Sequence, residues 1–167
     1  MLSTPPRFLS ASAMLCGLMA SLILVACHES EGYRVLDLTA KGGTAFESVN
    51  LANAEPWGSW SDGSPLALLL NEPLPKRFRL IITVAHVYGD NANKKVEVVV
   101  GDSVQSFTAP ADKKAVEVTF HDVLPGSRLI LFKIPNPQSP RAAGKSTDTR
   151  ELGIGIEKIE IAPALII

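Results

Sequence analysis

The chain has 167 residues, of which residues 1–26 have the pattern of a removable export signal, leaving 141 residues to fold. That length suits one domain, because a second independent hydrophobic core would need more chain. The remaining 15 Lys and Arg residues nearly balance 17 Asp and Glu residues, so nothing in the charge favours a nucleic-acid partner. Both cysteines, Cys16 and Cys27, lie in or beside the signal, which excludes a disulfide or a thiolate metal site in the body.

The N-terminal segment ends in a lipid-attachment motif. The apolar run between Arg7 and Cys27 is short for a membrane-spanning helix, which needs about 20 apolar residues, and suits a signal-peptide core. Leu24-Val25-Ala26-Cys27 matches the bacterial lipobox, in which the cysteine thiol takes a diacylglycerol. Acyl chains contribute about 0.8 kcal/mol per buried CH₂, so a lipidated Cys27 would hold the protein on a membrane. The alternative is an N-terminal anchor helix with an incidental cysteine.

This interpretation divides the chain into three parts. Residues 1–26 are the signal peptide, residues 27–32 are the lipidated cysteine with a short tether, and residues 33–163 are a β-rich body. His28 stands where an aspartate is the usual signal for retention in the inner membrane. By that sorting rule we expect the periplasmic face of the outer membrane rather than the inner membrane.

The body alternates short β-type runs with turn residues. Alternation of apolar and polar residues is clearest at 78–84, 96–100 and 116–120, so each of these runs can bury one face. Gly101-Asp102 predicts a tight hairpin, because glycine supplies the positive φ that such turns require. Further strands are expected at 34–39, 45–51, 66–70, 104–108, 128–134 and 152–161.

About nine strands without an amphipathic helix predict an all-β fold, namely a two-sheet antiparallel β-sandwich that is jelly-roll-like. Parallel βαβ architectures are excluded, because their crossovers need helices. The last run changes parity between Ile156 and Ile159, which predicts a bulge near Glu157 and Lys158. The irregular stretch 135–150 predicts a loop that is either functional or mobile.

Motifs for catalysis and metal binding are absent from the body, so we expect no enzyme, no cofactor and no metal site. His86 continues the phase of the 78–84 run and is expected to end a core face. His121 and Asp122 are adjacent on a predicted strand end, where neighbouring side chains point to opposite faces, so they do not form a catalytic pair.

The two tryptophans lie close together, in Trp57-Gly58-Ser59-Trp60-Ser61-Asp62-Gly63. Positions 57 and 60 have opposite parity on an extended segment, so we expect one ring in the core and the other outside. An exposed Trp60 beside polar groups suits a sugar, whose C–H face packs on the ring while neighbours bind hydroxyls. The alternative is that both rings plug the end of the sandwich. The candidate glycan-binding residues from this reading are Trp57, Trp60, Asp62 and Asn91.

A second constellation lies between residues 146 and 155. Gly153 and Gly155 within a strand indicate a bulge or a close backbone approach. Asp148 and Arg150 share parity and are expected to form a partly buried pair that pins the long loop. The alternative role of Arg150 is to bind an anionic group such as phosphoglycerol, which makes it the fifth candidate glycan-binding residue.

An ordered series of motifs resembles a known family. The motifs are Pro56-Trp57-Gly58-x-Trp60-Ser61-Asp62-Gly63, Pro73-Leu74-Pro75-x-x-Phe78-x-Leu80, Gly89-x-Asn91, Gln105-Ser106-Phe107-Thr108, Ile134-Pro135-x-Pro137-x-Ser139-Pro140 and Gly144-x-Ser146-x-Asp148-x-Arg150-x-Leu152-Gly153-Ile154-Gly155-Ile156. Over 35–161 the chain resembles a β-sandwich domain attached to bacterial phosphoglycerol transferases of osmoregulated periplasmic glucan synthesis and to some envelope glycosyltransferases. The resemblance implies a module accessory to envelope glycan modification.

The chain lacks the membrane helices and the metal-dependent catalytic domain of those transferases, so the resemblance does not imply transferase activity. We expect a lipid-anchored periplasmic module that binds a periplasmic glucan or another envelope glycan. The alternatives are a structural lipoprotein that braces a glycosyl or phosphoglycerol transferase and, less favoured, a small glycan-ester hydrolase. The expected partners are the membrane, through the lipid anchor, and such a glycan or transferase.

Overall fold

The computed structural model describes residues 33–39 and 45–164. Every described residue belongs to one compact unit within Glu31–Ile167. The expected signal peptide (1–26) and the lipidated Cys27 with its tether (27–32) lie outside the described residues. Among the residues that are described, no helix has the length and apolar character needed to cross a membrane.

Within the described residues, ten strands form two antiparallel five-stranded sheets. The first sheet has the order β1-β10-β5-β8, and β3 pairs with β10 as well. Its strands are β1 (Arg34–Asp37), β3 (Ser59–Asp62), β5 (Phe78–Val87), β8 (Lys114–Phe120) and β10 (Leu152–Pro163). The second sheet has the order β2-β4-β9-β6-β7, with β2 (Phe46–Val49), β4 (Leu66–Leu70), β6 (Lys95–Val100), β7 (Ser103–Thr108) and β9 (Leu129–Lys133). A 3₁₀ turn, η1 (Gly89–Asn91), follows β5.

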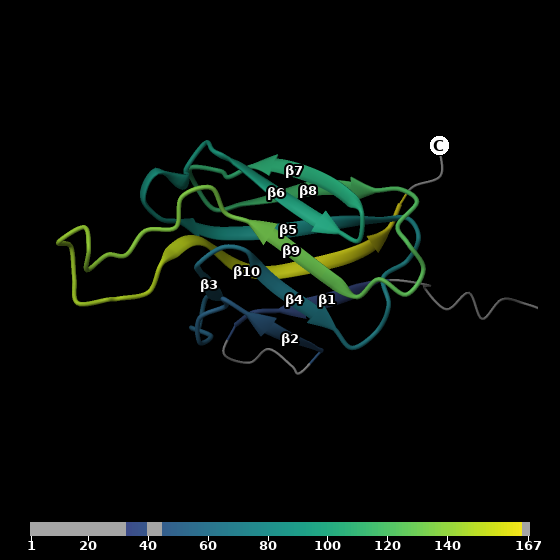
Figure 1. Cartoon of the computed structure of the whole chain (residues 1–167), viewed down its shortest axis with the longest axis horizontal. Helices are drawn as coiled ribbons and strands as arrows, with labels where there is room; N and C mark the ends of the chain where they lie inside the picture. Colours follow the sequence, from purple (N-terminus) through teal and green to yellow (C-terminus); the bar gives the residue numbers. More distant parts are fainter. Residues whose placement is uncertain (1–32, 40–44, 165–167) are drawn as a thin grey trace, which may run out of the picture. The chain divides into compact units, whose positions relative to one another are not determined.

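The chain passes from one sheet to the other at every connection except the β6–β7 hairpin (Figure 1). This alternation is the jelly-roll-like connectivity that we expected, and the predicted all-β sandwich of two antiparallel sheets is confirmed. All nine predicted strands are present, and the hairpin turns at Gly101-Asp102 as predicted. The strand Ser59–Asp62 was not predicted, because its sequence has two serines where a strand usually carries apolar residues.

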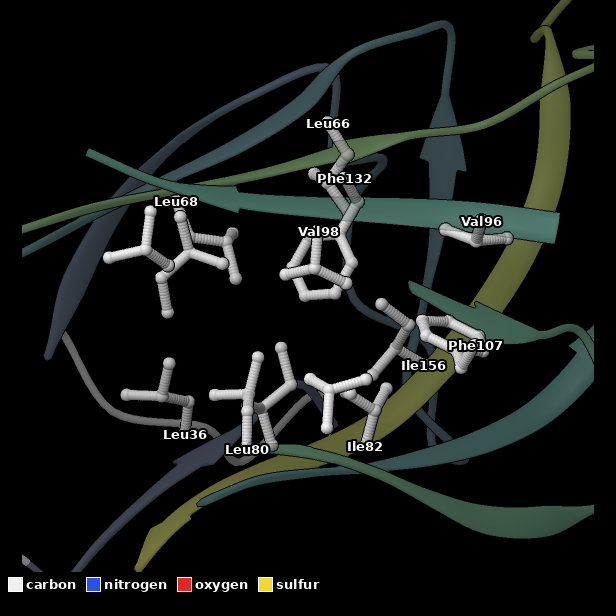
Figure 2. Packing of buried hydrophobic residues seen from close by; sticks show 14 of the residues in the cluster. Leu36, Leu66, Leu68, Leu80, Ile82, Val96, Val98, Phe107, Phe132 and Ile156 are labelled. Carbon is white, nitrogen blue, oxygen red and sulfur yellow. The ribbon is translucent and has the colours of Figure 1, made fainter. Parts of the chain in front are cut away.

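The core lies between the two sheets. Alternate residues of β4, β6, β9 and the first part of β5 point inward, so Leu68, Val98 and Phe132 of the second sheet face Leu80 and Ile82 of the first (Figure 2). Each of these five side chains is fully buried. Burial of one such side chain contributes about 1.5–3 kcal/mol, so the alternation itself provides the main driving force for the sandwich.

Bulges change the parity of two central strands. The register between β10 and β5 shifts between Ile156 and Lys158, which confirms the bulge predicted near Glu157. A second shift lies one residue earlier in β10, where Gly155 pairs with His86 and Ile156 pairs with Val84. Ala85 is therefore an extra residue in β5. The extra residue in β5 turns His86 to the outer face, where it is exposed. The prediction that His86 ends a core face is therefore wrong.

The loop 135–150 extends from one end of the sandwich, at the left of Figure 1. It folds on itself, since the Arg141 amide donates to the Asp148 carbonyl (2.8 Å) and the Lys145 amide donates to the Pro140 carbonyl (2.9 Å). Paired backbone bonds between Gln138 and Leu152, both 2.9 Å, close its base. These bonds place the loop beside the ends of β5 and β10.

Candidate functional site

Four ring side chains gather on the outer face of the first sheet, at the end that carries the 135–150 loop. We call Trp57, Trp60, His86 and Tyr88 the aromatic cluster. The Trp57 ring contacts Trp60 edge to face (centroids 5.4 Å apart, interplanar angle 76°) and His86 (4.5 Å, 88°). Trp60 also contacts His86 (5.8 Å) and, edge to face, Tyr88 (6.4 Å). His86 is exposed and the other three rings are half-buried.

Strand register brings these rings together. Gly155 of β10 pairs with Trp60 of β3 on one side and with His86 of β5 on the other. Because Gly155 has no side chain, the Trp57 ring lies directly over it. A Cβ at this position would stand only 2.7 Å from the Trp57 ring. The close backbone approach predicted at Gly155 is therefore confirmed, and the approaching group is an indole.

A tight turn places Trp57 on the same face as Trp60. The backbone groups of Glu55 and Gly58 exchange two hydrogen bonds (2.7 and 3.0 Å), and Gly58 has a φ of 145°, which glycine adopts more readily than other residues. The segment is thus folded rather than extended between the two tryptophans. The expectation that one ring enters the core and the other faces outward is wrong, because parity applies only within a continuous strand.

A network of hydrogen bonds among polar side chains fixes the Trp57 indole. The Trp57 indole Nε1 donates to the Glu55 carboxylate (2.9 Å), and the Arg150 guanidinium donates to the other oxygen of Glu55 (3.2 Å). Arg150 also donates to both carboxylate oxygens of Asp148, at distances of 2.7–3.1 Å. The predicted Asp148–Arg150 pair is confirmed. It connects the long loop to the aromatic cluster through Glu55.

The charges in this network are internally matched. Hydrogen bonds from Arg150 lower the pKa of the Asp148 carboxyl, and the same contacts raise the pKa of the Arg150 guanidinium above its ordinary value. One cation faces two carboxylates, Glu55 and Asp148, and its Nε, Nη1 and Nη2 atoms all donate to them. This arrangement disfavours an anionic ligand at Arg150 and favours a structural role in orienting Trp57.

We expect the 135–150 loop to become less ordered in acid, because protonation of Asp148 weakens its bonds to Arg150. Its folded pKa lies below the unfolded value of about 3.9, so its contribution to stability is present above that pH and is lost as the pH falls through the folded pKa. NMR shifts of the Arg141 and Arg150 amides should therefore stay constant above about pH 4 and change only below it. Asp148→Asn should show the loosened shifts at every pH. Identical titrations of the wild-type and Asp148→Asn proteins would contradict a role of the Asp148 carboxylate in ordering the loop.

Asp62 and Asn91 lie near the cluster in different settings. Asp62 is half-buried, two residues beyond Trp60 on β3, and its carboxylate accepts the Glu151 amide (2.7 Å). Asn91 is fully buried. Its side-chain amide donates to the carbonyls of Tyr88 (2.9 Å) and Asn136 (2.7 Å), and its oxygen accepts from the Asn136 amide (3.1 Å). Asn91 thus supports the backbone at Tyr88 from the interior, on the side away from solvent.

Sequence reasoning missed four residues of the site: Glu55, His86, Tyr88 and Lys145. The Lys145 ammonium lies 5.5 Å from the centroid of the Tyr88 ring, within the range of a cation–π contact. The strand pattern pointed His86 inward because the bulge in β5 leaves no signal in the sequence. In the described part of the chain, no group of three or more His, Cys, Asp and Glu residues is arranged to hold a metal ion.

Residues 42–163 match the profile of a family described as "Domain of unknown function (DUF7024)". The chain belongs to the DUF7024 family. Among its curated relatives, phosphoglycerol transferase I of Salmonella arizonae is 32% identical over 118 residues, which cover 68% of this chain and 15% of that protein. For phosphoglycerol transferase I of Salmonella typhi the values are 30%, 66% and 15%. This DUF7024 chain thus spans 15% of the length of these transferases, and the resemblance to a domain of phosphoglycerol transferases is confirmed.

Solved structures similar to this DUF7024 chain include "BiXyn10A CBM1 APO", with a TM-score of 0.49, 16% identity, and coverage of 78% of this chain and 97% of that one. The Podospora anserina GH26-CBM35 β-(1,4)-mannanase gives a TM-score of 0.43 with 15% identity, covering 81% of this chain and 28% of the mannanase.

Proposed function

We propose that this DUF7024 chain is a lipid-anchored, non-catalytic periplasmic module that is accessory to cell-envelope glycan modification and binds a glycan through its aromatic cluster. The observation that carries the proposal is the cluster itself, because Trp57 and Trp60 present half-buried rings on an open sheet face. Large aromatic side chains left partly in solvent are typical of binding surfaces.

The geometry of the cluster suits a sugar. Trp57 is fixed by its bond to Glu55 and by contacts on both sides, so binding would cost little conformational entropy in this ring. A sugar C–H face would pack on an indole. Asp62, two residues from Trp60 on the same strand, and the exposed His86 would accept or donate bonds to hydroxyls.

Family membership supports a role beside a transferase. The DUF7024 segment is a small part of the phosphoglycerol transferases that it matches, and we infer that their activity belongs to the remainder of those chains. In this chain the module binds a periplasmic glucan or a related envelope glycan and does not modify it chemically. No cofactor or metal enters this function.

Anchoring is tested at Cys27. Cys27→Ala should abolish incorporation of labelled palmitate and release the protein from the membrane fraction, because the thiol that accepts the lipid is gone. We expect the wild-type protein in the outer-membrane fraction, facing the periplasm. Labelling of the variant equal to wild type would contradict lipidation.

Glycan binding is tested at Trp60. Trp60→Ala should weaken binding of purified periplasmic glucan about tenfold or more in calorimetric titration, since loss of one aromatic contact of about 1.5 kcal/mol corresponds to that factor. Both glucan with phosphoglycerol substituents and glucan without them should be titrated, because the matched charges at Arg150 predict no preference for the anionic form.

Val104→Ala is the matched control, because Val104 is an exposed apolar residue of the second sheet, outside the cluster. It should bind as wild type does. Absence of glucan binding by the wild-type protein would overturn the glycan-binding proposal.

A second function is bracing of a transferase. It is favoured by the relatives, in which the same domain is part of a much longer chain and therefore has other parts of the enzyme as neighbours. Co-purification of a glycosyl or phosphoglycerol transferase with the tagged lipoprotein, retained in Trp60→Ala, would favour this function over glycan binding.

A further inference from the structure

The end of the sandwich opposite the aromatic cluster is where the described chain begins. We call it the entry end, and it comprises the start of β1 with the loops 71–77, 101–102 and 121–128. The Arg34 guanidinium donates to the Pro73 carbonyl (2.8 Å), and the Leu74 amide donates to the Ser127 carbonyl (2.7 Å). In Figure 1 the connection from β8 to β9 lies at the right and the 135–150 loop at the left.

Exposed apolar side chains gather in the half of the sandwich next to the entry end. Of the seven large apolar side chains that are exposed in the described residues, only Val49 lies in the half that carries the aromatic cluster. The other six, with exposed fractions of 40–53%, are Tyr33, Val35, Leu69, Val104, Leu124 and Leu129. Of these six, Tyr33 and Leu124 lie at the entry end itself, and they are the candidates for contact with another surface.

Leu124 is an exposed apolar residue in a loop of the entry end. It lies in the loop between β8 and β9 before Pro125-Gly126, and it is 52% exposed. The loops of the entry end carry three cations, Lys76, Arg77 and Arg128, and three carboxylates, Glu72, Asp102 and Asp122. The balanced charges would not repel a surface of anionic headgroups.

The short stretch of chain between Cys27 and Tyr33 keeps the entry end close to the proposed lipid anchor. Tyr33 is six positions after Cys27 in the sequence, and a fully extended chain spans at most about 3.5 Å per residue, so Tyr33 lies within about 20 Å of a lipidated Cys27. The ten residues of β5 run from the entry end to the aromatic cluster. At about 3.4 Å per residue, that strand separates the two ends by about 30 Å.

We propose that the entry end docks on the lipid bilayer, with Leu124 in the headgroup region, so that the aromatic cluster points away from the membrane. The inference rests on the proposed lipid anchor and adds a fixed orientation to it. A domain held this way presents its glycan-binding face to the periplasm rather than to the lipid surface.

The native tryptophans make the orientation measurable. Full-length lipoprotein is reconstituted into vesicles of phosphatidylethanolamine and phosphatidylglycerol that carry brominated acyl chains, which quench nearby indoles. Trp57 and Trp60 should keep their emission, because they lie at the far end. Leu124→Trp should add emission that is quenched at least about twofold, as expected for a side chain within the outer 5–10 Å of the bilayer. Val49→Trp, an exposed position in the other half, should add emission that is not quenched.

Vesicle flotation, measured first, separates failure of the anchor from failure of the orientation. Wild-type protein that does not float would overturn the lipid anchor and, with it, this inference. Floating protein in which both added tryptophans are quenched equally, or neither is, would overturn the docked orientation while leaving the anchor in place. Glycan titration of the same Leu124→Trp protein should match wild type, because the substitution lies away from the cluster.

Discussion

Gly155→Ala is expected to weaken glycan binding about tenfold or more, without any change to a residue that touches the ligand. The new Cβ would stand 2.7 Å from the Trp57 ring, closer than real carbon contacts allow. Trp60 and His86 pack against the ring from its sides, so it can only swing away from the strand and break its bond to Glu55. Calorimetric titration with glucan and near-ultraviolet circular dichroism would report the binding loss and the ring displacement together.

Gly153→Ala is the matched control for this effect. Its Cβ would crowd Ile134 and Ser61 instead of the aromatic cluster, so it should lower stability while leaving the cluster in place. Overpacking of this kind costs about 1–3 kcal/mol at either position. If both variants lost stability and neither lost glycan affinity at a temperature where they are folded, Trp57 would not be part of the binding face.

Phe132→Ala is expected to lower the free energy of unfolding by about 3–5 kcal/mol, the largest stability effect that we predict. Phe132 is fully buried in β9, between Leu66 of β4 and Val98 of β6. Its ring faces the side chains of the first sheet (Figure 2). Removal of the ring leaves a cavity that the two sheets cannot close, because each is held by its own backbone ladder. Urea unfolding followed by far-ultraviolet circular dichroism measures the change.

Val104→Ala provides the reference for Phe132→Ala, since Val104 is 53% exposed on the edge strand β7 and should change stability by less than about 0.5 kcal/mol. A loss below about 1 kcal/mol for Phe132→Ala would mean that the sheets are not packed through this residue. Glucan affinity of Phe132→Ala below its unfolding midpoint should equal that of wild type, which separates the core from the site.

Local patterns were sufficient to predict most of the fold. Alternation from Phe78 to Val84 predicts a half-buried strand because successive side chains on a strand point to opposite faces. The glycine at Gly101 predicts a hairpin for an equally local reason. The parity change in the last strand predicts its bulge near Glu157 because two apolar residues must remain on one face.

The site was only partly predictable. The pairing of Asp148 with Arg150 follows from their spacing, and it is confirmed. The contact of Arg150 with Glu55 joins residues 95 positions apart, and no local pattern predicts it. His86 was placed on the wrong face because the bulge in β5 arises from its pairing with β10 and leaves no trace in the composition of β5.

By itself, the sequence determined nine of the ten described strands, the two-sheet architecture and the family resemblance, because these follow from periodicity and motif order along the chain. Tertiary structure alone decided which side chains meet. Trp57 lies over Gly155 because a tight turn folds it back onto a strand almost one hundred residues away in the sequence, and His86 joins them through a shift of register. Such contacts depend on how strands pair in space, and strand pairing is non-local by nature.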